Sequence, residues 1–179
     1  MKILLMRHSE PTYTDVDERG YKGFGNDLGK LTERGIHLAE ATAERISAGD
    51  FGIGIELIVS SPYTRALQTA AIVSRVTGLK IEIETDLHEW IPDTTYQNNV
   101  GYSNSSWDEY LEKNGVRDAD CLYNWEEFDS VRKRALTALE KYRGNHQCIL
   151  AVAHGGIMRS LLNNKVKQID YCQVIEMEL

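Results

Sequence analysis

The stretch Lys2-Ile3-Leu4-Leu5-Met6-Arg7-His8 is an apolar run that ends in two side chains suited to binding or attacking an anion. A short apolar run that is followed by a polar loop is typical of a buried strand. Arginine offers a rigid fork of donors that matches phosphate oxygens, and histidine can act as a nucleophile or base near neutral pH. The stretch therefore predicts a strand at residues 2–6 with a candidate phosphate site at its carboxyl end.

The rest of the chain alternates short apolar runs with amphipathic segments. The apolar runs predict strands, and the segments with helical periodicity, a capping residue and a closing glycine predict helices. The expected strands cover residues 57–59, 79–83, 148–153 and 172–179, and the expected helices cover residues 32–47, 62–76, 126–143 and the segment after Gly155-Gly156. This alternation predicts a three-layer α/β/α sandwich around a mainly parallel sheet, with residues 1–179 forming a single domain.

Two segments lack clear periodicity. Residues 15–30 form a charged, glycine-rich stretch that is long for a connection inside a compact domain, and long loops are often functional. Residues 85–125 contain all three tryptophans, which are more typical of core positions than of a substrate platform. We expect residues 85–125 to form an excursion over the active site, and we expect substrate specificity to reside there and in residues 11–30.

The composition argues against several classes of protein. The chain has 20 Lys and Arg residues against 27 Asp and Glu residues, a net charge of −7, and no basic stripe, so we do not expect it to bind nucleic acid. No stretch reaches the roughly 18–20 apolar residues of a membrane span, and the N-terminal run is shorter than the roughly 7–15 apolar residues of a secretory signal. We expect a cytoplasmic protein without a membrane partner.

The cysteines give no sign of a metal site or a disulfide framework. Cys121, Cys148 and Cys172 are widely spaced and form no CxxC pair. In a chain of negative net charge, a local cluster of arginines is informative because a small anionic ligand would need one.

Candidate functional residues occur at two other positions along the chain. His154 follows the expected strand at 148–153, as His8 follows the strand at 2–6, and Arg65 lies in the first part of the helix after the strand at 57–59. In open α/β sheets, ligands bind outside the carboxyl ends of the strands, where helix N-termini also favour anions. We therefore expect these segments to meet at one edge of the sheet around a phosphoryl group.

Five motifs in this order resemble the signatures of the histidine phosphatase superfamily, the phosphoglycerate mutase-like proteins. They are Leu5-Met6-Arg7-His8-Ser9-Glu10, Leu31-Thr32-Glu33-Arg34-Gly35, Ser60-Ser61-Pro62-Tyr63-Thr64-Arg65-Ala66-Leu67-Gln68-Thr69-Ala70, Leu87-His88-Glu89 and Ala153-His154-Gly155-Gly156. Each motif alone is weak to moderate, but their order and spacing fit across nearly the whole chain. The resemblance implies a phosphoglycerate mutase-like fold.

The resemblance also implies a mechanism. His8 would attack phosphorus and form a phosphohistidine, while Arg7, Arg65 and His154 would hold the phosphoryl oxygens and stabilise the charge of the transition state. Glu89 would protonate the leaving oxygen and then activate water. The enzyme would be a metal-independent, histidine acid-phosphatase-type phosphoric monoester hydrolase that needs no cofactor.

The chain departs from the family pattern at two positions. Ser9 stands where the family has glycine, so its hydroxyl would contact phosphate or its side chain would crowd the loop. Thr14 stands where the family often has asparagine, and we expect it, with Ser9 and Gly155, to contact phosphate. The pair Glu126-Glu127 is interpreted as favourable charge in the first turn of a helix.

The leading hypothesis is a phosphomonoesterase that acts on a small phosphorylated metabolite. The alternatives are a phosphoglycerate mutase-type phosphoryl transferase, a non-catalytic relative that binds phosphorylated ligands, and a protein phosphohistidine phosphatase. The sequence sets neither the substrate nor the oligomeric state.

Overall fold

The fold is built on a five-stranded sheet with the strand order β5-β4-β6-β1-β7. The computed structural model describes residues 1–21, 23–52, 54–97, 100–166 and 168–179. The strands of this sheet are β1 (Lys2–Arg7), β4 (Leu57–Ser60), β5 (Ile81–Ile83), β6 (Cys148–Ala153) and β7 (Val174–Glu178). Strands β5, β4, β6 and β1 run parallel, and β7 pairs antiparallel with β1 at the edge. The mainly parallel sheet predicted from the sequence is confirmed.

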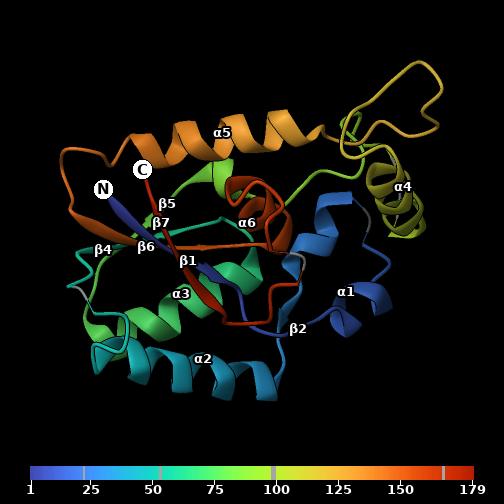
Figure 1. Cartoon of the computed structure of the whole chain (residues 1–179). Helices are drawn as coiled ribbons and strands as arrows, with labels where there is room; N and C mark the ends of the chain where they lie inside the picture. The colour runs from blue at the N-terminus through green and yellow to red at the C-terminus, as the bar shows by residue number, and fades with distance from the viewer. Residues whose placement is uncertain (22, 53, 98–99, 167) are drawn as a thin grey trace.

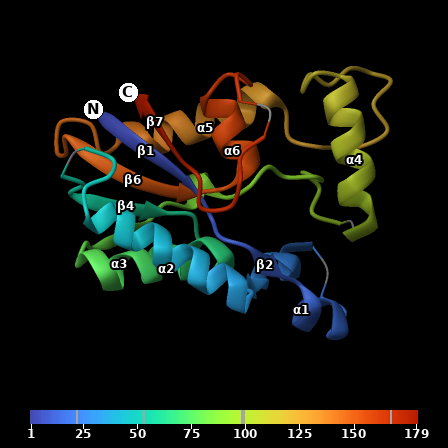
Figure 2. The same ribbon diagram turned by 60° about the horizontal axis from the view of Figure 1, so that its bottom comes forward.

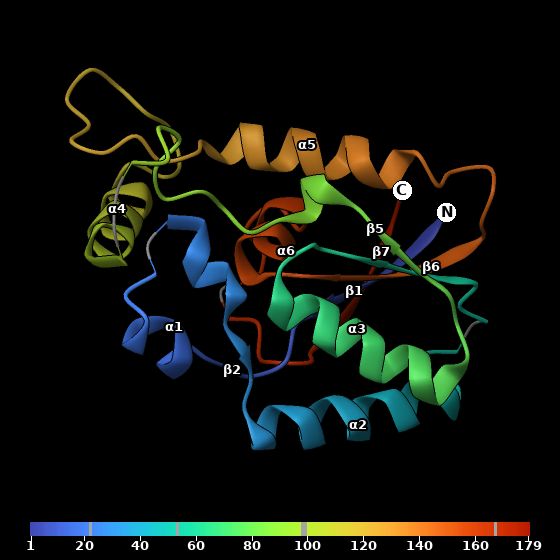
Figure 3. The same ribbon diagram turned by 180° about the vertical axis from the view of Figure 1, so that it is seen from behind.

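Helices cover both faces of the sheet and complete the expected three layers (Figures 1 and 3). Helices α2 (Glu33–Ser47) and α3 (Thr64–Thr77) lie on one face, and α5 (Phe128–Glu140) and α6 (Gly155–Leu161) lie on the other. Ile3 and Leu5 enter the core under α5 and α6, whereas Leu4 and Met6 enter the core under α2 and α3. Because both faces are covered, β1 is apolar at successive positions and does not alternate with polar residues.

Smaller elements extend beyond the carboxyl ends of the parallel strands. Strands β2 (Pro11–Thr12) and β3 (Lys30–Leu31) pair antiparallel. Between them lie helix α1 (Thr14–Glu18) and the 3₁₀ helix η1 (Gly23–Leu28). The 3₁₀ helix η2 (Thr85–Leu87) and helix α4 (Val100–Glu112) belong to the later irregular segment. Figure 2 shows α1 and α4 projecting from the same end of the sheet.

Several element boundaries differ from the sequence prediction. Strand β5 begins at residue 81, not 79, and is an edge strand with Ile83 59% exposed, so its alternating residues do not form a buried face. Strand β7 begins at residue 174 because Cys172 has a left-handed φ of 57°, which an extended strand does not allow. Helix α5 begins at Phe128, because Glu127 has the extended backbone of an N-cap residue, with φ −70° and ψ 152°.

Candidate active site

Neighbouring strands bring His8 and His154 together. Arg7 pairs with Ala153 across β1 and β6, and the backbone N–H of His8 donates to the carbonyl of Ala153 at 2.9 Å. The rings of His8 and His154 therefore lie with their centroids 5.1 Å apart. Both side chains are buried, because they follow central strands that are covered on both faces.

Strand β4, on the other side of β6, supplies the next two groups. The N–H of Ser61 donates to the carbonyl of Val152, and its Oγ lies 2.7 Å from Nε2 of His154. Helix α3 begins at Thr64, so Arg65 lies in its first turn. The Nε of Arg65 donates to Nε2 of His8 at 3.3 Å. Three adjacent strands thus place two imidazoles and one guanidinium side by side.

The hydrogen bonds of His8 define its tautomer. A guanidinium can only donate, so Nε2 of His8 accepts from Arg65 and carries the lone pair. Nδ1 therefore carries the proton and donates to the carbonyl of Ser9 at 2.7 Å. Burial, followed by the charge of Arg65, lowers the pKa of His8 to about 3. The ring is neutral near pH 7, with Nε2 available as a nucleophile.

His154 is held in a matching way. The hydroxyl of Ser61 accepts from the N–H of Tyr63 at 3.3 Å, so it is free to donate to Nε2 of His154. Nδ1 of His154 is shielded from solvent and has no hydrogen-bond partner. Burial, followed by the charge of Arg65, lowers the pKa of His154 well below its usual value. His154 is therefore a neutral ring with one buried nitrogen unpaired.

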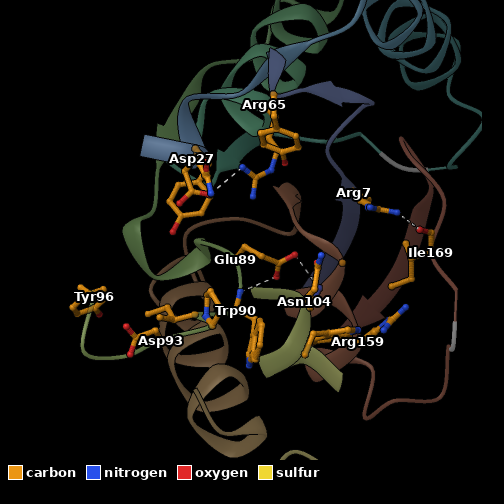
Figure 4. Close-up of a pocket in the computed structure, with 18 of the residues that line it drawn as sticks. Arg7, Asp27, Arg65, Glu89, Trp90, Asp93, Tyr96, Asn104, Arg159 and Ile169 are labelled. Carbon is orange, nitrogen blue, oxygen red and sulfur yellow. Dashed lines mark hydrogen bonds and ion pairs between the residues drawn. The ribbon is translucent and has the colours of Figure 1, made fainter. Parts of the chain in front are cut away.

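Arg7 and Arg65 have different partners. Arg7 donates through one terminal nitrogen to the carbonyl of Ile169 at 2.6 Å and lies 4.2 Å from the ring centroid of Tyr171. Arg65 forms an ion pair of 3.1 Å with Asp27 of η1 (Figure 4). Burial raises the pKa of Asp27, against the smaller opposing effect of Arg65. The carboxylate of Asp27 is thus paired with Arg65, a side chain that we expect to bind phosphate.

The carboxylate of Glu89 is fixed by two backbone N–H groups. Its oxygens accept from Trp90 at 2.8 Å and from Gly156, at the start of α6, at 3.3 Å. A Cβ on Gly156 would lie 2.5 Å from the Glu89 carboxylate, so glycine is needed for this approach. Two of the five family motifs, the one with Glu89 and the one with Gly156, therefore contact each other.

A buried ion pair holds the backbone around Glu89, which we call the Glu89 segment (residues 86–91). Arg134 of α5 binds both carboxylate oxygens of Glu126, at 2.7 and 2.9 Å. The same guanidinium donates to the carbonyls of Asp86, His88 and Glu89. The interpretation of Glu126 as a favourable charge in the first turn of a helix is wrong, because Glu126 precedes α5 and is buried against Arg134.

A cavity of about 600 Å³ lies in front of these groups. Arg7, Arg65, Glu89 and Arg159 line it (Figure 4). Trp107 also lines it and lies next to Arg159. His8 and His154 contact residues of this lining, His8 through Arg65 and His154 through the ring of Tyr63. Among the described residues, no three His, Cys, Asp or Glu side chains are grouped so that they could hold a metal ion.

A comparison with family models decides the relationship. The model of the histidine phosphatase superfamily (branch 1) matches residues 3–174. The chain belongs to this superfamily. A search of curated proteins finds no match. The family resemblance drawn from the five motifs is thereby confirmed, and membership supports phosphatase or mutase chemistry.

Solved structures show the same fold for this histidine phosphatase at low sequence identity. Bacillus stearothermophilus YhfR is 21% identical with a TM-score of 0.75, covering 99% of this chain and 91% of its own. A mycobacterial glucosyl-3-phosphoglycerate phosphatase is 20% identical with a TM-score of 0.71, covering 99% and 90%. Phosphoglycerate mutase from Bacillus anthracis is 17% identical with a TM-score of 0.72, covering 98% and 86%. None of the described helices of the histidine phosphatase is long and apolar enough to cross a membrane.

The three further phosphate contacts expected in this histidine phosphatase lie in different settings. Ser9 is fully buried, and its hydroxyl donates to the carbonyl of Gly35 at 2.6 Å, outside the cavity lining. Thr14 is exposed, and its hydroxyl lies 3.0 Å from that of Thr12. Gly155 lines the cavity, where a Cβ would lie 3.7 Å from Nε of Arg7. Of the three, only Gly155 faces the candidate site.

Sequence reasoning missed several residues of the site. Ser61 and Tyr63 lie in the same motif as Arg65, and their short distance from Arg65 along the sequence could have indicated them. Asp27 lies in a glycine-rich segment without periodicity, where no sequence signal marks it. Arg159 lies three residues after Gly156 on the same helix, and a helical-face argument could have placed it in the site. Trp90, predicted as core, is 8% exposed yet also lines the cavity.

Proposed function

We propose that the protein is a phosphomonoesterase that hydrolyses a small phosphorylated metabolite through a phosphohistidine at His8. The observation that carries the proposal is the state of this ring, which is buried, neutral, held at Nδ1 by the carbonyl of Ser9 and in contact with Arg65 at Nε2. A fixed neutral imidazole beside cationic side chains suits attack on an anionic phosphoryl group.

In the first step, Nε2 of His8 forms a bond to phosphorus while the bond from phosphorus to the ester oxygen breaks. Glu89 gives a proton to the leaving oxygen. In the second step, Glu89 takes a proton from water, the water oxygen bonds to phosphorus, and the bond to Nε2 breaks and returns its electron pair to the ring. Inorganic phosphate and the regenerated His8 are the products.

The other groups stabilise the charge that develops on the phosphoryl oxygens. Arg7 and Arg65 supply fixed positive charge. Since Ser61 occupies Nε2 of His154, the free Nδ1–H of this ring is left to donate to a phosphoryl oxygen. Asp27 competes with the phosphoryl group for Arg65, so binding would exchange one anion for another. These tasks need no metal ion, and we expect activity to persist in the presence of a chelator.

The similar structures support a phosphorylated metabolite as substrate. One is named as a phosphatase of glucosyl-3-phosphoglycerate and another as a phosphatase of α-ribazole 5′-phosphate. Both names describe phosphate esters of small organic molecules, which a cavity of about 600 Å³ has room to hold.

The test measures phosphate release from p-nitrophenyl phosphate and a metabolite panel, together with labelling by radioactive phosphate. We expect His8→Ala to abolish both turnover and labelling. We expect Glu89→Gln to slow turnover while phosphoenzyme still forms from esters with good leaving groups. Labelling that persists in His8→Ala would refute the assignment of His8 as the nucleophile.

The same assay separates the alternatives. Isomerisation of 3-phosphoglycerate, with its bisphosphate primer, that outpaces phosphate release would indicate a mutase. Wild-type protein that releases no phosphate from any ester would indicate a non-catalytic binding protein.

A further inference from the structure

Helix α6 sets an order along the cavity. Its first residue, Gly155, lies against Arg7, and the N–H of its second residue, Gly156, donates to the carboxylate of Glu89. Arg159 follows three residues later on the same face. Three residues of helix correspond to about 4.5 Å along the axis. The order therefore runs from the phosphate side, past the proposed proton donor, to Arg159.

The side chain of Arg159 lies within the cavity lining (Figure 4). Side chains on a helix lean toward its N-terminus, so Arg159 leans back toward the turn that carries Gly156. Because Glu89 would protonate the leaving oxygen, the part of the substrate that departs would begin beside Glu89, and the cavity continues from there to Arg159.

Arg159 differs from the other arginines of this region in having no polar partner. Within the residues that the structure describes, it makes no hydrogen bond or ion pair, and its Nε is shielded from solvent. Arg134 has Glu126, Arg65 has Asp27, and Arg7 has the carbonyl of Ile169. Because the guanidinium of Arg159 lines the cavity and has no acceptor in the described chain, it is available to pair with a ligand anion.

The neighbours of Arg159 form an aromatic wall. Its guanidinium carbon lies 5.7 Å from the ring centroid of Trp107. Trp107 stacks on Tyr110 with an interplanar angle of 13° and meets Trp90 edge to face. The carboxylate of Asp93, which also lines the cavity, accepts bonds from the backbone N–H groups of Thr95 and Gln97. The wall therefore presents aromatic rings beside the cavity, with the guanidinium of Arg159 next to Trp107 and the carboxylate of Asp93 in the same lining.

We propose that Arg159 and Trp107 form a subsite for a second anionic group, a carboxylate or a second phosphate, on the leaving part of the substrate. The proposal rests on the proposed phosphatase function and narrows its substrate class. The scissile phosphate would lie at Arg7 and Arg65, the organic body would lie along Trp107, and the second anion would pair with the fork of Arg159.

The test compares matched esters. 4-Carboxyphenyl phosphate carries a second anion, 4-carbamoylphenyl phosphate is its neutral counterpart, and 1,4-phenylene bisphosphate presents a second phosphate. For wild type and each variant, we take the ratio of kcat/KM for a charged ester to kcat/KM for the neutral ester. This ratio does not depend on the fraction of the protein that is active. We expect Arg159→Gln to lower this ratio at least about tenfold, the effect of one charge-assisted hydrogen bond. The charged ester with the larger loss identifies the preferred anion.

Two further variants complete the comparison. Arg159→Lys should retain part of the preference, because the charge remains while the planar fork is lost. Arg143→Gln, at an exposed arginine paired only with Glu140, should leave the ratio unchanged. An Arg159→Gln ratio equal to that of wild type for both charged esters would overturn the subsite alone. Wild-type protein that hydrolyses none of the three esters would overturn the proposed function and the subsite with it.

Discussion

Replacing Arg134 with methionine should destabilise the protein strongly, because it would leave Glu126 as an unpaired buried charge. The side chains of this ion pair are 14% and 6% exposed. Removing one partner of a buried pair typically costs about 3–5 kcal/mol. The carbonyls of the Glu89 segment would lose their shared donor as well.

Urea denaturation measures this cost directly. With an m-value of about 2 kcal/mol/M, a loss of about 3–5 kcal/mol lowers the urea midpoint by roughly 1.5–2.5 M. The control is Arg75→Met, at an arginine whose side chain is 67% exposed and which pairs with Glu40 on the surface. We expect the control to change stability by less than about 1 kcal/mol. Equal midpoints for Arg134→Met and Arg75→Met would refute the reasoning.

A double variant separates stability from positioning. Changing Glu126 to leucine together with Arg134→Met removes both charges, and such replacements are often neutral or stabilising. We expect the double variant to recover most of the lost stability. The carbonyls of the Glu89 segment would still lack the hydrogen bonds that Arg134 donates. Turnover of esters with poor leaving groups, which depends on proton donation by Glu89, should then stay reduced relative to p-nitrophenyl phosphate. Equal recovery on both kinds of ester would mean that the pair serves stability alone.

Three further predictions concern the groups at the phosphate site. The pKa values of His8 and His154 are lowered from 6.5, so the unfolded chain binds protons below pH 6.5 that the folded chain does not bind. The free energy of unfolding should therefore fall by about 1.4 kcal/mol per histidine between pH 7.5 and pH 5.5, and a urea midpoint that stays constant would contradict this. Asp27→Asn frees Arg65 and should tighten inhibition by orthovanadate roughly fivefold, equivalent to about 1 kcal/mol; an unchanged inhibition constant would show that Asp27 does not compete. Glu89→Gln should reduce turnover of alkyl phosphates far more than that of p-nitrophenyl phosphate, and a uniform loss across the esters would argue against proton donation by Glu89.

The layered fold and the meeting of the motifs follow from local patterns. Alternating strands and helices predict a parallel sheet, and parallel strands place His8 and His154 at one edge. The structure adds what no local pattern contains. The partners of Arg134 include three carbonyls more than 40 positions earlier in the chain, and only the packing of α5 brings them within reach. The Ser9 hydroxyl likewise finds its acceptor, Gly35, on a helix of another layer.

Residues whose role depends on which charged groups lie beside them are the hardest to recognise in a sequence. Arg159 resembles any helical arginine until the structure shows that no carboxylate lies beside it within the described chain. Asp27 resembles a loop acid until its contact with Arg65 is known. The helical spacing from Gly156 indicates that Arg159 lies near the site. Whether a charged partner lies beside Arg159 or Asp27 depends on other elements, which sequence periodicity does not relate to them.

The central position of β6 has a consequence for how the molecule assembles. Strands β1 and β4 both pair with β6 and not with each other, although β6 follows them by many residues in the chain. During synthesis the earlier strands would have to wait for Cys148–Ala153 before the sheet could close, which gives the fold many contacts between distant residues and favours slow folding. A chain that ended before β6 would contain His8 but not His154. The candidate phosphate site would therefore form only after β6 had joined the sheet between β1 and β4.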